Sequence, residues 1–114
     1  MEVERSLNQP VYQKLKQVAR SRSLISYSEI VPLVGSGISS PRDPRLARIL
    51  RNICSFEVEH GRPMLGAVVV RRADSRPGKG FIIGAIRLGV FHGDDELAFW
   101  NAELNRVYQY WSEN

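Results

Sequence analysis

The run from Met64 to Val70, MLGAVVV, is the sequence feature that most restricts how this chain can fold. Its residues are apolar or small and end in three valines, whose β-branched side chains favour extended backbone. Four cations follow within nine residues, at Arg71, Arg72, Arg76 and Lys79. We therefore predict a buried strand over 64–70 that leads into an exposed basic loop over 71–79.

Three helices are predicted ahead of this strand, each from a local start signal. The signals are a proline in the first turn at residue 10, a capping box (S-x-x-E) at 26–29 and an Asp-Pro pair at 43–44. The predicted helices cover 10–21, 26–35 and 43–60, and the first follows a cap at Asn8 or Gln9. In the third helix, Arg45, Arg48 and Arg51 recur at three-residue spacing and predict a basic ridge.

Two further elements are predicted after the strand. The segment 81–89 suits a short helix that ends at Gly89, although its GFIIGAI sequence also suits a returning strand. A last helix over 94–112 is predicted to begin at Asp94. Its stripe of Trp100, Leu104, Tyr108 and Trp111 is typical of a helix packed on a core.

This order of elements predicts an α+β fold that is mostly helical. Three helices followed by a small β element with a basic loop indicate a winged helix-turn-helix-like domain, to which a C-terminal helix is added. The length of 114 residues suits one domain spanning 1–114, with a body at 10–90 and the added helix at 94–112.

Charge is divided unevenly along the chain, whose formal net charge is +4. Residues 1–90 carry 15 Lys and Arg against 7 Asp and Glu, a net +8, whereas residues 91–114 carry 1 against 5, a net −4. Most of the cations are Arg, whose planar guanidinium binds phosphates and carboxylates well. The basic body therefore indicates an anionic partner, although an ordinary solvated basic surface has the same composition.

The sequence also bears on location. The single cysteine, Cys54, excludes an intramolecular disulfide, and the N-terminus MEVERSLNQP has no apolar core of signal-peptide length. No segment reaches the roughly 18 apolar residues of a membrane span. We expect a soluble, cytoplasmic protein with no membrane partner.

Several short motifs share their order with a known family. The segment ISYSEIVPLVG resembles the TYGEIA-type second helix of the alkylguanine-DNA alkyltransferase and alkyltransferase-like DNA-binding domain. That family continues with an Arg-bearing recognition helix, an I-P-C-H-R-V-V strand, a G-x-x-G-G-Y-type turn and a short helix. This chain continues with RLARILRNI, RPMLGAVVV, RPGKGF and FIIGAIRLG, so the resemblance spans about residues 10–90.

The resemblance implies DNA docking without alkyl transfer. If Pro63 takes the place of the family's proline, Met64 stands where the alkyl-accepting cysteine belongs, and a thioether cannot act as an activated thiolate. The implied nucleic-acid contacts are Tyr27, Arg45, Arg48, Arg51, Arg71, Arg72, Arg76 and Lys79.

Other chemistry has little support in the sequence. Cys54 and His60 lie six residues apart, which sets them on different sides of one helix and prevents a nucleophile–base pair. No Cys or His spacing fits a zinc site, so we predict no cofactor and no metal. A Mg²⁺ site of a nuclease, built from Glu57, Glu59 and Asp74, is a weak enzymatic alternative.

Two functions follow from these patterns. The first is a non-catalytic nucleic-acid-binding module, for DNA, that docks through the basic helix and the basic loop. The alternative is a protein-interaction or accessory domain with no nucleic-acid activity. The aromatic residues Phe99 and Tyr110, which lie off the stripe of the C-terminal helix, leave room there for a protein partner or a homodimer.

Overall fold

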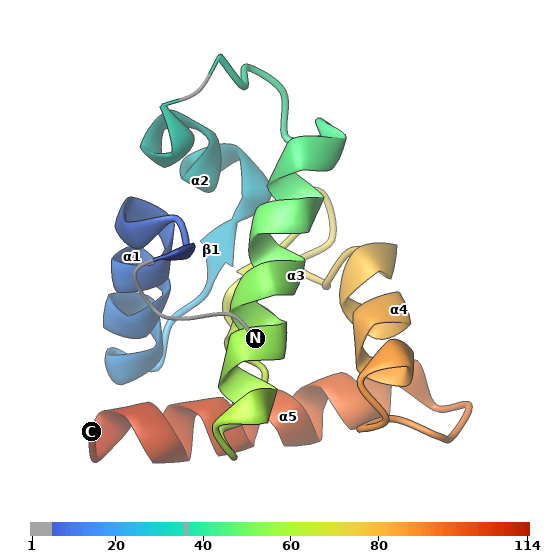
Figure 1. Cartoon of the computed structure of the whole chain (residues 1–114). Coiled ribbons are helices and arrows are strands. Elements are labelled where there is room, and N and C mark those ends of the chain that lie inside the picture. The colour runs from blue at the N-terminus through green and yellow to red at the C-terminus, as the bar shows by residue number, and fades with distance from the viewer. Residues whose placement is uncertain (1–5, 36) are drawn as a thin grey trace.

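A computed structural model describes residues 6–35 and 37–114, and within them the chain is mostly helical with one small sheet (Figure 1). The helices are α1 (Gln9–Arg20), α2 (Tyr27–Val34), α3 (Pro44–Glu59), α4 (Lys79–Arg87) and α5 (Glu96–Ser112). The other elements are β1 (Ile25–Ser26), the 3₁₀ helix η2 (Leu65–Val68) and β2 (Val69–Val70). The mostly helical α+β prediction is confirmed. The described residues do not include 1–5, which belong to the N-terminal segment considered for a signal peptide. They also do not include residue 36, in the loop before the third predicted helix.

The first three helices begin at the predicted signals. The Asn8 side chain accepts a hydrogen bond from the Val11 amide, and the Asp43 carboxylate accepts one from the Arg45 amide. At the start of α2, Ser26 and Glu29 exchange the two bonds of a complete capping box. Gly35 ends this helix in the left-handed conformation with φ of 73°. These helix ends depend only on contacts between residues close together in the sequence, so they could be predicted from the sequence.

The predicted strand over 64–70 is wrong for most of its length. Only Val69–Val70 is extended, while Leu65–Val68 forms a turn of 3₁₀ helix. Every residue from Met64 to Val70 is buried, so the run has no alternation of exposed and buried positions to specify a strand. β2 pairs in parallel with β1, with Ile25 opposite Val69.

The last two helices were predicted with small errors in their starts. The segment predicted as a helix over 81–89 forms α4 (Lys79–Arg87), which Leu88 caps and a left-handed Gly89 follows, so the alternative of a returning strand is wrong. The cap of α5 is Asp95 rather than Asp94, because the Asp95 carboxylate accepts the Ala98 amide.

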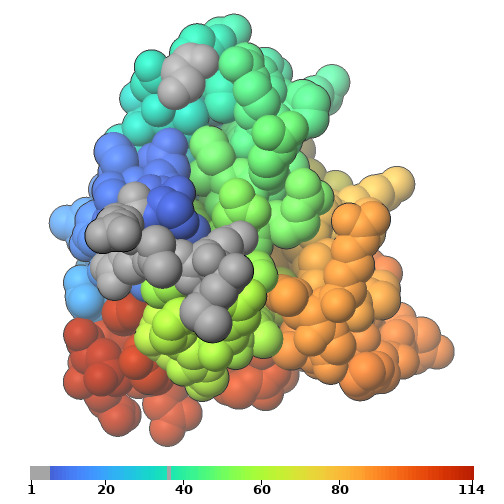
Figure 2. Space-filling model, in the orientation of Figure 1, coloured from blue at the N-terminus to red at the C-terminus, as the bar shows by residue number. Residues whose placement is uncertain are grey.

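The aromatic stripe of α5 belongs to the core, as predicted. Trp100, Leu104 and Trp111 are buried, and the Trp100 indole N–H donates to the Ala67 carbonyl at 2.9 Å. α5 crosses the molecule beside α1 and η2, while α2 lies at the opposite end (Figures 1 and 2). The acidic end of the chain is therefore distant from α2.

No helix within 6–35 and 37–114 combines the length and apolar character needed to cross a bilayer.

Candidate functional site

An open cavity of about 440 Å³ lies between α2, α3, α4 and the loop after β2. Its lining consists of Tyr27, Ser28, Pro41, Arg42, Ala47, Leu50, Arg51, Cys54, Met64, Gly66, Arg71, Arg72, Ala73, Gly78, Gly80, Phe81, Gly84 and Leu88. Its buried members are apolar or small, including Leu50, Met64 and Phe81. Ligand sites are commonly of this size and character.

Four arginines form a cationic rim around this apolar floor. They are Arg42, Arg51, Arg71 and Arg72, and all four are exposed. Among the described residues that line the cavity, none is Asp or Glu. Asp74, outside the lining, pairs with Arg71, and the other three arginines leave the rim positively charged, which favours an anionic ligand.

The predicted basic ridge of α3 is divided between two sides of the helix. Three-residue spacing turns each arginine by about 60° relative to the one before, so Arg45 and Arg51 lie about 120° apart. Arg51 lines the cavity, whereas Arg45 and Arg48 do not. Arg45 instead pairs with Asp43, with 2.7 Å between Nη2 and Oδ2, and this ion pair lowers the pKa of Asp43 to about 2.

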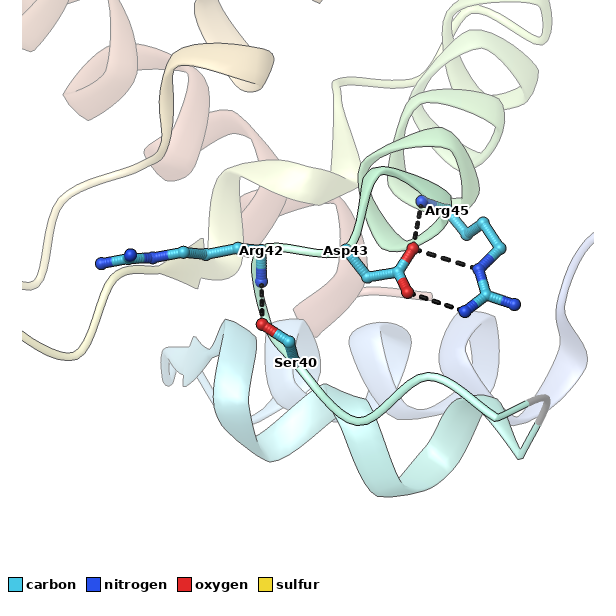
Figure 3. Close-up of polar contacts among 4 residues, drawn as sticks. All are labelled: Ser40, Arg42, Asp43 and Arg45. Carbon is cyan, nitrogen blue, oxygen red and sulfur yellow. Dashed lines mark hydrogen bonds and ion pairs between the residues drawn. The ribbon is translucent and has the colours of Figure 1, made fainter.

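Arg42 is a member of the rim that sequence reasoning missed. It lies in the turn before α3, where its amide donates to Ser40 Oγ at 3.1 Å, and its side chain extends away from Arg45 (Figure 3). The sequence offered only a weak signal, a cation directly before the Asp-Pro start of a helix.

The basic loop is ordered by one acidic residue. The Asp74 carboxylate pairs with Arg71, with 2.7 Å from Nη2 to Oδ2, and accepts the Arg76 amide at 3.1 Å. The Arg71 amide also donates to the Arg76 carbonyl at 2.8 Å, which closes the loop. Arg71 and Arg72 line the cavity as a result, whereas Arg76 and Lys79 lie outside its lining.

Tyr27 fixes the end of the basic loop to α2. Its hydroxyl oxygen accepts the Gly78 amide at 3.0 Å, and burial raises the pKa of this phenol. A Cβ on Gly78 would lie 2.9 Å from that oxygen, so the approach requires glycine. Tyr27 was predicted as a nucleic-acid contact, and the structure places its side chain both in the cavity lining and in this loop contact.

Cys54 supplies a thiol to the cavity floor but no reactive thiolate. Burial raises the pKa of this thiol to about 12, against a smaller opposing effect of the Gly66 amide, which donates to Sγ at 3.3 Å. His60 lies at the end of α3, where Nδ1 contacts the Phe56 carbonyl at 2.8 Å. Met64, at the position implied for the acceptor cysteine, also lines the cavity.

Two buried acids position the segment that carries Met64. The Glu57 carboxylate accepts the Tyr12 hydroxyl at 3.0 Å and pairs with Arg62 at 2.7 Å. The Glu103 carboxylate accepts the Met64 amide at 2.8 Å and pairs with Arg106. Sequence reasoning did not identify the contacts of Glu57 with Tyr12 and of Glu103 with Met64, because the partners lie 45 and 39 residues apart in the chain.

The acids considered for a Mg²⁺ site are not assembled into one. Glu57 is bound to Arg62 in the interior, whereas Asp74 is bound to Arg71 on the exposed loop. Over the described ranges, no group of three His, Cys, Asp or Glu is placed to hold a metal ion.

Comparison with known proteins found no family model, no curated protein and no solved structure that matches this chain.

Proposed function

We propose that this chain is a non-catalytic, winged-helix-like module that binds DNA through α3 and the basic loop. The observation that carries the proposal is the rim of four arginines, Arg42, Arg51, Arg71 and Arg72, around one cavity. Guanidinium groups donate paired hydrogen bonds to phosphate oxygens, and such contacts provide most of the affinity of proteins for nucleic acid. No acid belongs to the described lining, and since Asp74 pairs with Arg71 from outside it, Arg42, Arg51 and Arg72 provide most of the attraction for a phosphate.

The order of the elements supports the winged-helix comparison. α2 and α3 are successive helices separated by the segment 35–43, and α3 presents Arg51 to the cavity. The basic loop follows β2 and lines the same cavity as α3, which supports our comparison of this loop with a wing. In such domains the second helix of the motif contacts a groove while neighbouring loops contact the backbone.

The environment of Cys54 supports a binding role rather than transfer chemistry. A thiol with a pKa near 12 is almost fully protonated at neutral pH, and the thiolate is the nucleophile in cysteine chemistry. His60, the histidine nearest in sequence, caps the C-terminal end of the same helix six residues later and so lies on a different side of it.

The apolar floor extends the proposal to the bases. Contacts with the phosphate backbone need only the cationic rim, whereas the floor formed by Leu50, Met64 and Phe81 suits a flat apolar group. An unstacked base has this shape, and proteins that extract a base hold it between apolar or aromatic side chains. We propose that the rim holds the backbone while the cavity receives such a base.

The backbone contacts are tested by fluorescence anisotropy with a labelled random-sequence duplex at several salt concentrations. The logarithm of the affinity should fall linearly with the logarithm of salt. Replacing all four rim arginines by Gln should weaken binding and reduce the slope by about 3 to 4, because each lost phosphate contact removes about 0.9. The matched control replaces Lys14, Arg20, Arg22 and Arg87, which lie outside the lining, by Gln.

Two results would contradict the backbone proposal. One is no binding at low salt, which would leave the protein-interaction role as the remaining function. The other is an equal reduction of the salt-dependence slope in the rim variant and in the control. That result would show that binding depends on the overall charge of the protein rather than on the arginines around the cavity.

The base contact needs a separate comparison. A duplex with one unpaired base should bind several-fold more tightly than the matched duplex, because less stacking and pairing energy opposes its extraction. Equal affinities would limit the site to backbone contacts.

A further inference from the structure

Two glycines of α4 border open space in the cavity. Gly80 and Gly84 both belong to the lining, and a Cβ added to either would meet nothing among the described residues within 4 Å beyond its own stretch of helix. Gly66 in the same lining differs, because a Cβ there would lie 2.7 Å from the Cys54 sulfur. Contacts within the described chain therefore explain the glycine at position 66 but not those at positions 80 and 84.

Gly84 also weakens the helix that carries it. It lies inside α4, where glycine is less favourable than alanine because it loses more conformational freedom on folding. The residue is buried and has free space beside it, so a side chain at this position would extend into the cavity. Glycine lets a ligand approach the backbone closely, and this role fits Gly84.

The two glycines form a strip of bare backbone, which we name the glycine strip. They are four residues apart, which places them on one face of α4 and about 6 Å apart along its axis. Leu50, Met64 and Phe81 supply apolar side chains to the same cavity. A flat apolar group such as an aromatic ring can lie against this strip and also contact those side chains.

Positive charge surrounds the same space. Arg42, Arg51 and Arg72 belong to the rim and are exposed, whereas Arg71 is paired with Asp74. Within the described residues no side chain caps the start of α4, and the first-turn amides of a helix attract anions. The cavity therefore favours a ligand that carries a negative group beside an apolar body.

We propose that the cavity binds a small aromatic carboxylate. The ring lies against the glycine strip, and the carboxylate accepts paired hydrogen bonds from the guanidinium groups of the rim. The cavity volume of about 440 Å³ is within the range of about 300–1,000 Å³ that holds small organic ligands. Such a ligand carries its charge and its ring in one free molecule, so its binding does not depend on the proposed DNA function.

Isothermal titration calorimetry of naphthoate with the full chain, without DNA, tests the ligand class. We expect a Kd below about 1 mM. Naphthalenemethanol has the same rings without the charge and should bind at least about tenfold more weakly, because it forms no ion pair with the rim. No binding of naphthoate at millimolar concentration, or equal affinities for the acid and the alcohol, would overturn the proposal.

Filling the cavity tests where the ring lies. Gly84→Leu should weaken naphthoate binding by at least about tenfold, because the added side chain occupies the space beside the glycine strip. Ala102→Leu is the matched control, since it adds a side chain at an exposed position of α5 outside the lining. After circular dichroism has shown that both variants keep the wild-type helix content, undiminished binding by Gly84→Leu would overturn the location.

The rim is tested by a double variant, Arg51→Gln with Arg72→Gln. It should weaken naphthoate binding about tenfold and leave the binding of naphthalenemethanol unchanged, because only the acid contacts the guanidinium groups. The matched control, Arg48→Gln with Arg87→Gln, removes the same charge outside the lining. An equal loss in both double variants would overturn the rim as the carboxylate site. Naphthoate binding by a chain that binds no DNA would support this proposal while contradicting the DNA function.

Discussion

Gly66 lies so close to Cys54 that no side chain fits between them. A Cβ on residue 66 would lie 2.7 Å from the Cys54 sulfur, and the Gly66 amide donates to the same sulfur at 3.3 Å. Because Cys54 is buried in α3, the sulfur has little room to move away. This contact fixes the distance between α3 and the 3₁₀ turn at the cavity floor.

Gly66→Ala tests this contact, with an expected loss of roughly 2 kcal/mol in the free energy of unfolding from overpacking. Adding Cys54→Ala should recover most of that loss, since it removes the sulfur that the new methyl meets. Urea unfolding of both single variants and the double variant measures the coupling. Additive effects of the two changes would contradict the contact.

The buried Cys54 thiol also predicts a dependence of stability on pH. Its pKa is raised by burial from 9.0 to about 12, so the folded chain keeps this proton where the unfolded chain has lost it. The stabilisation is complete below the unfolded pKa and declines as pH rises from about 9 toward 12. The free energy of unfolding of the wild-type chain, compared with that of Cys54→Ala, should fall by roughly 1 kcal/mol between neutral pH and about pH 10.

Urea unfolding of the two chains at neutral and alkaline pH measures this difference. Comparing the chains cancels the titration of Tyr and Lys residues that they share. A difference in unfolding free energy that does not change with pH would show that the thiol titrates alike in the folded and unfolded states.

At the scale of elements, local signals were predictable and tertiary contacts were not. The capping box of Ser26 and Glu29 lies within four residues, so it fixes the start of α2 wherever the helix packs. The conformation of 64–70 instead depends on distant partners, among them Glu103 for the Met64 amide and Trp100 for the Ala67 carbonyl. An apolar run buried on all sides does not distinguish strand from helix.

Tyr27 is the link between two such elements, because its hydroxyl accepts the Gly78 amide at the start of α4. Tyr27→Phe should lower stability by about 1 kcal/mol and speed amide hydrogen exchange across the basic loop. Tyr108→Phe is the matched control. Its hydroxyl donates to the Ser23 carbonyl at 2.7 Å, far from the loop in the chain. Equal exchange in the loop of both variants would contradict the link.

At the scale of the whole molecule, the division of charge was visible in the sequence, but its arrangement around a cavity was not. The predicted contacts Tyr27, Arg51, Arg71 and Arg72 come from α2, α3 and the basic loop, and the fold brings them to one lining. Arg45 and Lys79 have the same charge and point elsewhere, since helix geometry sets the direction of each side chain. Residues 94–114 contribute nothing to the lining, so the acidic helix leaves the rim uncovered.

The proposal that the arginine-rimmed cavity is the DNA site is tested most directly by amide chemical-shift mapping. The labelled full chain is titrated with an unlabelled random-sequence duplex at low salt, and its ¹H–¹⁵N spectra are compared. We predict shifts around the cavity, at residues 41–54, 64–66 and 71–84, with α1 and the second half of α5 unchanged. Shifts confined to α1 or α5, or no shifts at saturating DNA, would contradict the proposal.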